Sequence, residues 1–211
     1  MSRWFALALV AVLVTGCTSS STKKPDEPDK GSKVRRFAFK DVPSNREVGA
    51  PLPGEDAELT APDGRSVHIK DYRGRPVLLV FTRGFMGYIC QYCLTYTAQL
   101  ASKKGELEAM GVTTLVVYPT KEQDEAKVKE FTEAVNQALQ EEGLDALPFP
   151  VFLDRGLAAV SRFNLTGDLS KPSTFVLDRQ GVVRYAYVGE APDDRPAIDR
   201  VLEELRKVPA Q

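Results

Sequence analysis

An unbroken apolar segment at residues 77–81, followed closely by two cysteines, is the feature that most constrains the fold. A continuous run of Val, Leu and Phe is typical of a strand that is buried on both faces of a sheet. Cys90 and Cys93 follow, at the point where a helical pattern begins. A dithiol between a buried strand and a helix N-terminus is the arrangement that makes a thiol a redox nucleophile. The pair therefore predicts thiol redox chemistry.

The rest of the chain alternates strand and helix patterns, with Gly111 and Gly143 as helix ends. The expected strands are residues 58–60, 66–69, 77–82, 112–118, 151–153, 173–177 and 182–188, and the expected helices are residues 92–110, 124–142, 157–163 and 196–207. This order predicts an α/β fold, with a central mixed sheet flanked by helices on both faces and an N-terminal β-hairpin extension. Residues 36–40 alternate weakly and could add an edge strand.

The first residues resemble the signal of a bacterial lipoprotein. Arg3 precedes a short apolar run at residues 4–14, and small residues lead into Cys17. The run is too short to span a bilayer. The resemblance implies cleavage after residue 16 and acylation of Cys17, which would tether the protein to a membrane of the bacterial cell envelope, facing the periplasm or the cell exterior. The alternative is an ordinary cleaved signal or a short anchor, in which Cys17 is incidental.

The chain is thus expected to have three segments: residues 1–16 as the signal, residues 17–50 as the lipidated cysteine, tether and N-terminal extension, and residues 51–211 as one thioredoxin-like domain. Residues 18–33 are nearly all Ser, Thr, Lys, Pro, Asp and Gly, so they have nothing to bury and are expected to be flexible. Thr18 after the lipid cysteine resembles the lipoproteins that are sorted to an outer membrane.

The composition argues against several classes of partner and cofactor. A net charge of −1 leaves no basic surface for nucleic acid. The chain has three cysteines, too few for a disulfide framework once Cys17 is lipidated. A closed zinc site needs four ligands, and only His68 could join Cys90 and Cys93; Leu94 stands where haem attachment would need a histidine. We expect no metal and no cofactor, and we expect His68 to be a half-exposed strand residue rather than a base.

The two cysteines differ in their expected roles. Cys90 lies near a helix N-terminus, where unsatisfied N–H groups and the helix dipole favour the thiolate and make it the nucleophile. Cys93 lies one turn along the same face and can attack a mixed disulfide or a sulfenic acid formed at Cys90. A structural disulfide is the alternative, since the envelope is oxidising, although so small a loop adds little stability.

Four landmarks lie in a fixed order along the chain. They are residues 77–93, Phe-Pro-Val-Phe-Leu-Asp at 149–154, Val-Ser-Arg-Phe-Asn at 160–164, and Pro-Ser-Thr-Phe-Val-Leu-Asp-Arg-Gln-Gly at 172–181. In this order they resemble the thioredoxin-fold redoxins, and among them the alkyl hydroperoxide reductase and thiol-specific antioxidant family, the peroxiredoxins. The resemblance runs from about residue 51 to the final helix. It implies a thioredoxin-like fold and thiol-dependent redox activity.

The resemblance points to two branches. The spacing from Val77 to Cys90 is similar to that of peroxiredoxins and puts Cys90 in the place of their peroxide-attacking cysteine. Their Pro-x-x-x-Thr-x-x-Cys pattern is here Arg83-x-x-x-Gly87-x-x-Cys90, without the threonine hydroxyl that holds the peroxide, and Pro172 replaces a late-strand arginine. Pro172 instead resembles the cis-proline that faces the dithiol in thioredoxin and in periplasmic thiol reductases. Arg83 either supplies positive charge near Cys90 or is a solvated loop arginine.

Three functions follow. The first is a membrane-tethered thiol–disulfide oxidoreductase, in which Cys90 exchanges with a partner protein's disulfide, Cys93 resolves, and Pro172, Gly87 and Arg83 shape the substrate groove. The second is a thiol-dependent peroxidase, in which Cys90 reduces a hydroperoxide and Cys93 condenses with the sulfenic acid. The third is a non-enzymatic binding module whose disulfide is static.

Overall fold

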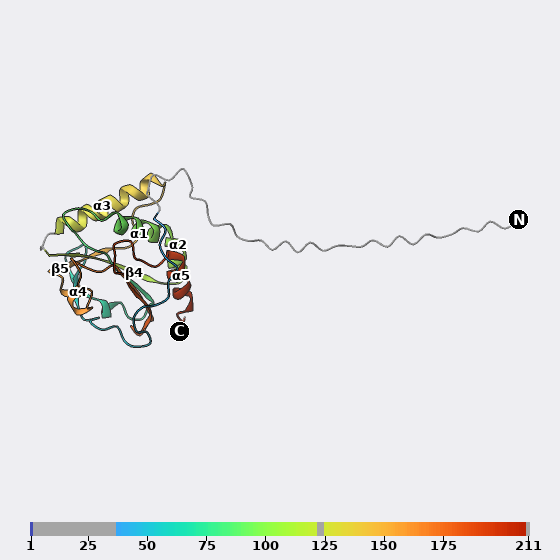
Figure 1. Ribbon diagram of the computed structural model, residues 1–211, viewed down its shortest axis with the longest axis horizontal. Coiled ribbons are helices and arrows are strands. Elements are labelled where there is room, and N and C mark those ends of the chain that lie inside the picture. The colour runs from blue at the N-terminus through green and yellow to red at the C-terminus, as the bar shows by residue number, and fades with distance from the viewer. Residues whose placement is uncertain (2–36, 122–124, 210–211) are drawn as a thin grey trace. The chain divides into compact units, whose positions relative to one another are not determined.

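The computed structural model describes residue 1 and residues 37–121 and 125–209 (Figure 1). The expected signal sequence, Cys17 and the tether lie outside the described residues. Among the helices that the structure does describe, none is both long and apolar enough to cross a membrane.

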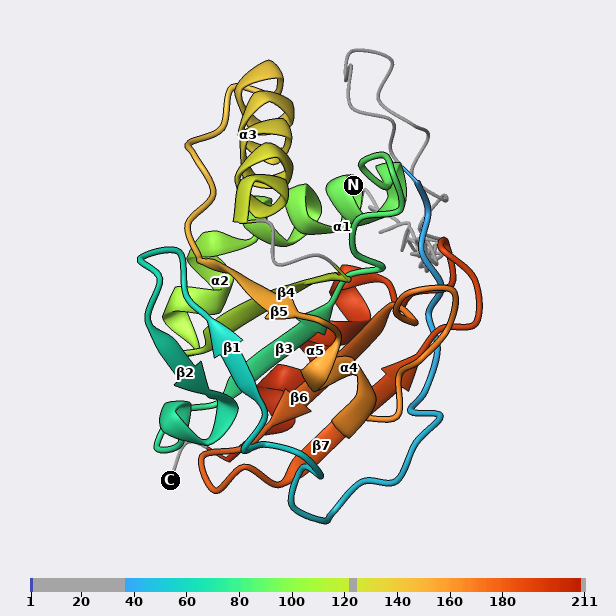
Figure 2. The same cartoon turned by 90° about the vertical axis from the view of Figure 1, so that its left-hand side faces the viewer.

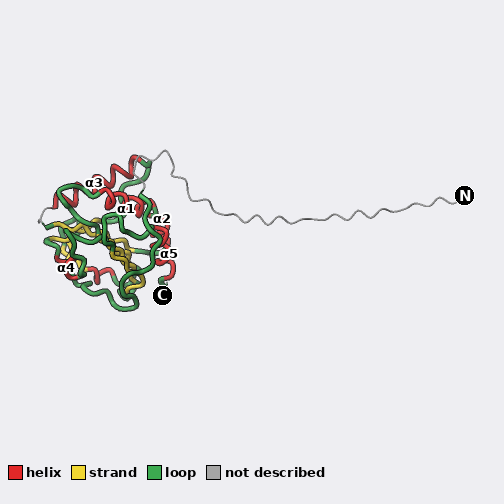
Figure 3. Tube along the Cα trace, in the orientation of Figure 1, coloured by secondary structure: helices red, strands yellow, loops and turns green. Residues whose placement is uncertain are grey.

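The described residues form a seven-stranded mixed sheet in the order β2-β1-β5-β4-β3-β6-β7. Figure 3 shows the strands in yellow, with helices in red around them. The central strands β3, β4 and β5 run parallel, while β6, β7 and the β1–β2 hairpin add antiparallel pairs. The strands are β1 (Glu58–Thr60), β2 (Ser66–His68), β3 (Val77–Phe81), β4 (Thr113–Thr120), β5 (Val151–Arg155), β6 (Ser173–Leu177) and β7 (Val183–Val188). The predicted mixed sheet and its hairpin are confirmed.

The apolar run of β3 lies in the middle of this sheet. All of its side chains are buried, and its register with β4 pairs Val77 with Thr113 and Phe81 with Val117. Because side chains alternate along a strand, Leu78 and Val80 face one hydrophobic cluster, and Leu79 and Phe81 face the other. A continuous apolar strand is thus explained by burial on both faces.

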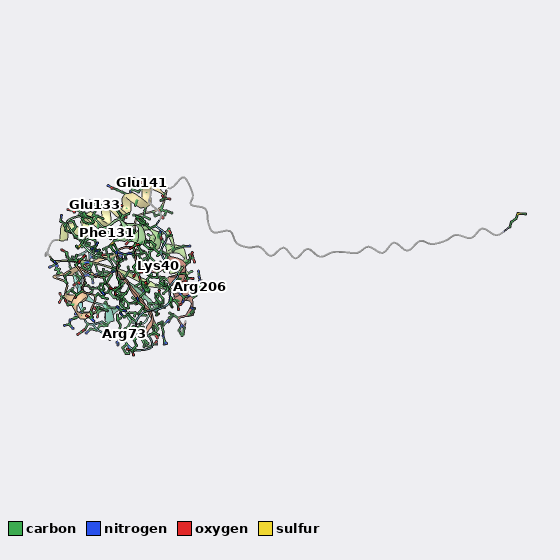
Figure 4. The ribbon with its side chains drawn as sticks, in the orientation of Figure 1. Lys40, Arg73, Phe131, Glu133, Glu141 and Arg206 are labelled. Carbon is green, nitrogen blue, oxygen red and sulfur yellow. The ribbon has the colours of Figure 1, made fainter. Side chains whose placement is uncertain are left out.

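Helices cover both faces of the sheet. They are η1 (Ile69–Tyr72), α1 (Gln91–Ser102), α2 (Lys104–Ala109), α3 (Glu125–Glu141), α4 (Ala158–Arg162) and α5 (Ile198–Lys207). Figure 2 shows α4 and α5 on opposite sides of the sheet, in agreement with the two clusters that their side chains join. On α3, Phe131 is fully buried while Glu133 and Glu141 are exposed (Figure 4), so one stripe of the helix meets the core.

Two of the sequence landmarks owe their aspartates to backbone capping. Asp154, at the end of β5, is fully buried, and its carboxylate accepts the N–H groups of Ala159 and Val160 at 2.8 and 2.9 Å. Asp178, after β6, accepts the N–H groups of Gln180 and Val182, each at 2.9 Å. These carboxylates satisfy donors that the start of α4 and the turn into β7 would otherwise leave unpaired. The landmarks therefore report the fold more than the chemistry.

The expected single helix at residues 92–110 is two helices, α1 and α2. The Ser102 hydroxyl donates to the carbonyl of Gln99 at 2.7 Å, and this is the carbonyl that Lys103 N–H would reach in a continuous helix. Lys103 N–H bonds to Leu100 instead, at 3.0 Å. This shorter bond closes α1 at Ser102, and α2 begins after Lys103.

Residues 37–45, which we call the strap, run beside the C-terminal part of the chain (blue in Figure 2). The rings of Phe37 and Tyr92 lie 4.2 Å apart. Lys40 N–H donates to the carbonyl of Arg195 at 3.0 Å, and Lys40 forms an isolated parallel bridge with Pro196. The edge strand expected at residues 36–40 is thus wrong within the described residues, because Lys40 pairs with the loop before α5, and the strap reaches the edge strand β7 only at Ser44 and Asn45.

Candidate active site

Cys90 is the N-cap of α1. Its extended backbone (φ −67°, ψ 115°) lets Sγ accept the N–H of Cys93 at 3.4 Å, while its carbonyl accepts the N–H of Leu94 at 3.0 Å. The sulfur thus pairs with a donor that the first turn of a helix leaves free. The Cys90 residue is 4% exposed. The helix begins where the sequence pattern indicated, with Cys90 at its positive end.

Cys93 lies one turn further along α1 and is fully buried. Two N–H groups meet its sulfur: the Arg83 backbone N–H at 3.3 Å and the Arg195 guanidinium, through Nη2, at 3.1 Å. Both cysteines are free thiols. The second cysteine therefore lies in a pocket of donors that suits a negatively charged sulfur.

The environment separates the acidities of the two thiols. The hydrogen bond donated by the Cys93 side chain is the largest effect on Cys90, and with the Cys93 backbone N–H and the charge of Arg195 it lowers the Cys90 pKa to about 6 despite burial. Burial, followed by the hydrogen bond to Cys90, raises the pKa of Cys93 well above its usual range. At neutral pH the pair thus holds one proton on Cys93 and a thiolate on Cys90.

Arg195 is the residue that the sequence reasoning missed. It is 2% exposed, its Nε donates to the carbonyl of Pro192 at 3.0 Å, and its guanidinium carbon lies 5.3 Å from the centre of the Tyr96 ring. Arg195 is 102 positions from Cys93 and belongs to no motif, so no local signal marked it. The positive charge expected near the dithiol is therefore present, but it comes from the loop before α5.

Tyr118 is a buried polar side chain on the cysteine side of the sheet. Its ring stacks on Phe131 with centroids 4.6 Å apart, and among the described residues its hydroxyl has no hydrogen-bond partner. Burial, and after it the neighbouring Cys93 and Cys90, raise the pKa of Tyr118, so the hydroxyl stays protonated. An unpaired buried hydroxyl costs about 1–3 kcal/mol. The Tyr118 hydroxyl is therefore a hydrogen-bond donor near the dithiol that has no acceptor among the described residues.

The side chain and the backbone of Arg83 have different partners. Its side chain forms an ion pair with Asp168 at 2.8 Å, so the guanidinium is directed to that carboxylate, while the backbone N–H contacts Cys93. Gly87 has a φ of +84°, and a Cβ placed on it would meet nothing within 4 Å. The missing threonine is therefore explained by a left-handed backbone that favours glycine.

Pro172 lies directly before β6 and has a trans peptide bond. Ser173 pairs with Phe81, so Pro172 lies at the end of the sheet from which the loop to Cys90 leaves. No cis peptide bond occurs in the described part of the chain, so the cis-proline expectation is wrong. Pro172 stands directly before β6 with its carbonyl accepting Gly189 N–H at 2.8 Å, a place where a trans proline costs no ladder bond.

His68 is the last residue of β2, with a side chain that is 36% exposed and an Asp71 carboxylate 3.5 Å from Nδ1. This is the half-exposed strand position that the sequence indicated. Within residues 37–121 and 125–209, no three His, Cys, Asp or Glu side chains gather where a metal ion could bind.

A thiol of lowered pKa that caps the first helix after a buried strand, with its partner one turn away, is typical of a redoxin of thioredoxin fold. Comparison with protein-family models narrows this class, because residues 48–186 match the AhpC/TSA family. The chain belongs to that family, as its landmarks indicated. Arg195 and the strap lie outside the matched residues.

Known relatives agree with this assignment. The chain is 29% identical over 134 residues to "Peroxiredoxin Q, chloroplastic" of Oryza sativa subsp. japonica, a match over 59% of this chain and 52% of that protein. The chain thus spans about half the length of the curated relatives it matches.

Solved structures of low sequence identity share the fold. Peroxidoxin BcpB of Mycobacterium tuberculosis has a TM-score of 0.59 and 18% identity over 78% of this chain and 100% of its own. A putative protein disulfide isomerase of Bacteroides thetaiotaomicron has a TM-score of 0.55 and 16% identity over 80% of this chain and 94% of its own.

Proposed function

We propose that the protein is a thiol–disulfide oxidoreductase tethered to a membrane of the bacterial cell envelope. The observation that carries the proposal is that the two cysteines differ in acidity and in hydrogen-bond donors. Cys90 has a pKa lowered to about 6, while Cys93 keeps a proton and has two N–H donors waiting at its sulfur. A site built around the second cysteine is suited to resolving a mixed disulfide.

The exchange proceeds in two balanced steps. The Cys90 thiolate attacks one sulfur of a partner disulfide, a mixed disulfide forms, and the other partner sulfur leaves as a thiolate. Cys93 then loses its proton and attacks Cys90 Sγ, the Cys90–Cys93 disulfide forms, and the remaining partner sulfur leaves with the electron pair. Two electrons pass to the partner, and the reverse steps oxidise a partner dithiol.

The pH profile of attack on a disulfide tests this proposal. With a pKa of about 6, Cys90 should react at a rate that rises through pH 6 and levels off above it, because the thiolate is then fully formed. A thiolate of low pKa is also a weaker nucleophile, so at pH 7 Cys90 should react only about twofold faster than glutathione. At pH 5, where glutathione is almost fully protonated, Cys90 should react roughly 20-fold faster. The measurement is reduction of insulin disulfides by the reduced full-length chain. A rate equal to that of glutathione at pH 5 would contradict the proposal.

A thiol-dependent peroxidase is the second candidate, and one observation favours it. Cys90 is 4% exposed, and a hydroperoxide is small enough to reach such a sulfur. In this reaction Cys90 would attack the peroxide, an alcohol or water would leave, and Cys93 would condense with the sulfenic acid to release water. Against it, Gly87 offers no hydroxyl, and Arg195 contacts Cys93 rather than Cys90. Hydrogen peroxide in place of insulin distinguishes the candidates, because a peroxidase oxidises far faster than a free thiol.

The membrane tether and the envelope location are supported by the lipoprotein-like signal alone. We expect the peptide that begins at Cys17 to carry acyl chains, and Cys17→Ser to move the protein from the membrane fraction to the soluble fraction. Mass spectrometry of that peptide and fractionation of cells are the measurements. Unmodified Cys17 in membrane-bound protein would contradict the tether.

A further inference from the structure

We propose that Arg195 is a catalytic residue for the second step of the exchange, in which its guanidinium stabilises the Cys93 thiolate that attacks the mixed disulfide at Cys90. This inference rests on the proposed two-step exchange. It assigns a function to a residue that lies outside the family-matched residues 48–186.

The first support is the geometry at Cys93. Arg195 Nη2 lies 3.1 Å from Sγ, and the Arg83 backbone N–H lies 3.3 Å from the same atom. A thiol sulfur is a weak acceptor, whereas a thiolate accepts charge-assisted bonds of about twice the strength of neutral ones. The two donors therefore stabilise the reacting form of Cys93 more than its resting form, which is the condition for accelerating a step.

The second support is the charge balance around Arg195. The side chain is buried, and among the ion pairs that join described residues none includes Arg195. Its other contacts are the neutral carbonyl of Pro192 and the Tyr96 ring. Burying an unpaired cation is costly, so an anion within reach is strongly favoured. The dithiol is the group in contact that can become that anion.

The third support is that the site orders the two steps. The titratable groups that act electrostatically on Cys93 are Cys90 and Arg195, and Cys93 in turn raises the pKa of Tyr118. In the resting state burial has the largest effect and raises the pKa of Cys93, and the hydrogen bond to Cys90 and the charge of Cys90 raise it further. When Cys90 enters a mixed disulfide, its charge is gone, while the opposing effects of Arg195 and of the Arg83 N–H remain. The pKa of Cys93 is therefore lower after Cys90 has reacted than before, although burial still raises it.

The strap and the neighbouring loop hold Arg195 in place. Lys40 N–H donates to the Arg195 carbonyl at 3.0 Å, and Lys40 Nζ (labelled in Figure 4) pairs with Asp194 at 3.0 Å. Asp194 also accepts the Tyr187 hydroxyl at 2.8 Å and the Glu190 N–H at 2.9 Å. These bonds hold Asp194 and the backbone of Arg195, so Lys40 and Asp194 are positioning residues.

The test follows the two sulfur steps separately with one equivalent of dithiodipyridine, whose thiopyridone product is read by absorbance. The first release reports attack by Cys90, and the second reports attack by Cys93 on the mixed disulfide. Arg195→Met should slow the second release by roughly 10- to 100-fold, the loss expected for one charge-assisted hydrogen bond. It should also move the pH midpoint of the second release upward. Arg195→Lys should recover part of the rate, because it restores a positive charge.

The controls separate chemistry from folding. Arg206→Met removes an exposed guanidinium from α5 and should change neither release, and Cys93→Ser should show the first release alone. The native chain gives a readout that needs no Arg195 variant: its second release should have a pH midpoint below about 8.5, the value for an unperturbed thiol, although Cys93 is buried.

Two results would overturn the inference: a second release that Arg195→Met leaves unchanged, or a native midpoint at or above that of a free thiol. The probe replaces the partner protein. If only the proposed function were wrong, both thiopyridone releases would still occur at the expected rates, but the protein would not reduce insulin.

Discussion

Cys90→Ser is expected to lower the rate of disulfide exchange by about a thousandfold or more. Cys93→Ser is expected to stop the reaction at the mixed disulfide. A serine hydroxyl is not ionised at neutral pH and does not attack disulfide sulfur, so the first variant loses the nucleophile. The second keeps a Cys90 nucleophile but loses the group that releases the partner. Mass spectrometry of Cys93→Ser after mixing with insulin should therefore show a covalent adduct on Cys90 that dithiothreitol removes.

The matched control for these variants is Cys17→Ser, which makes the same substitution outside the dithiol and should leave exchange in detergent unchanged. Exchange that survives in Cys90→Ser would assign the nucleophile to Cys93 and reverse the proposed roles. Full activity of Cys93→Ser, with no adduct on its Cys90, would remove the resolving step altogether.

Much of the fold could be predicted because its signals are local. The buried strand β3 is a continuous apolar run, β4 contains a shorter one, and α3 has the spacing of an amphipathic helix. The break in the expected long helix has no such local signal. Nothing in the propensity of residues 92–110 shows that the Lys103 N–H bonds to Leu100 instead of continuing the helix.

The candidate site was predictable only where chemistry and sequence spacing coincide. Cys90 and Cys93 share one helical turn, so their meeting follows from helix geometry. Arg195 reaches Cys93 across 102 positions, through a loop held by the strap, and such a contact depends on tertiary structure alone. Arg83 was singled out for its charge, but its backbone N–H is what contacts the dithiol. Sequence spacing indicated the right place for this residue and the wrong group.

Gly84→Ala is expected to be the most destabilising single change in the loop between β3 and α1. Gly84 and Gly87 have nearly the same backbone, with φ of +83° and +84°. They differ in their surroundings: a Cβ on Gly84 would lie 2.1 Å from the carbonyl oxygen of Pro119 and 2.6 Å from Leu169 Cδ2, whereas a Cβ on Gly87 meets nothing within 4 Å. The pair therefore separates backbone strain from steric overlap.

We expect Gly87→Ala to cost about 1–2 kcal/mol of unfolding free energy, the cost of a left-handed alanine. Gly84→Ala should cost about 2–5 kcal/mol, because overpacking against backbone adds to the same strain. Urea denaturation of both variants measures the difference. Equal costs would show that the loop moves away from Pro119 freely.

The Gly84→Ala substitution should also slow one step of the exchange. Gly84 lies between Arg83, whose N–H contacts Cys93, and Phe85, whose N–H donates to the Pro119 carbonyl at 3.2 Å. Relieving the overlap with Pro119 must shift this loop, so the Arg83 N–H should lose its place at the sulfur. We therefore expect folded Gly84→Ala to slow the attack by Cys93 more than the attack by Cys90, while Gly87→Ala slows neither. Equal slowing of both steps would mean that the loop limits access to the dithiol rather than stabilising the second thiolate.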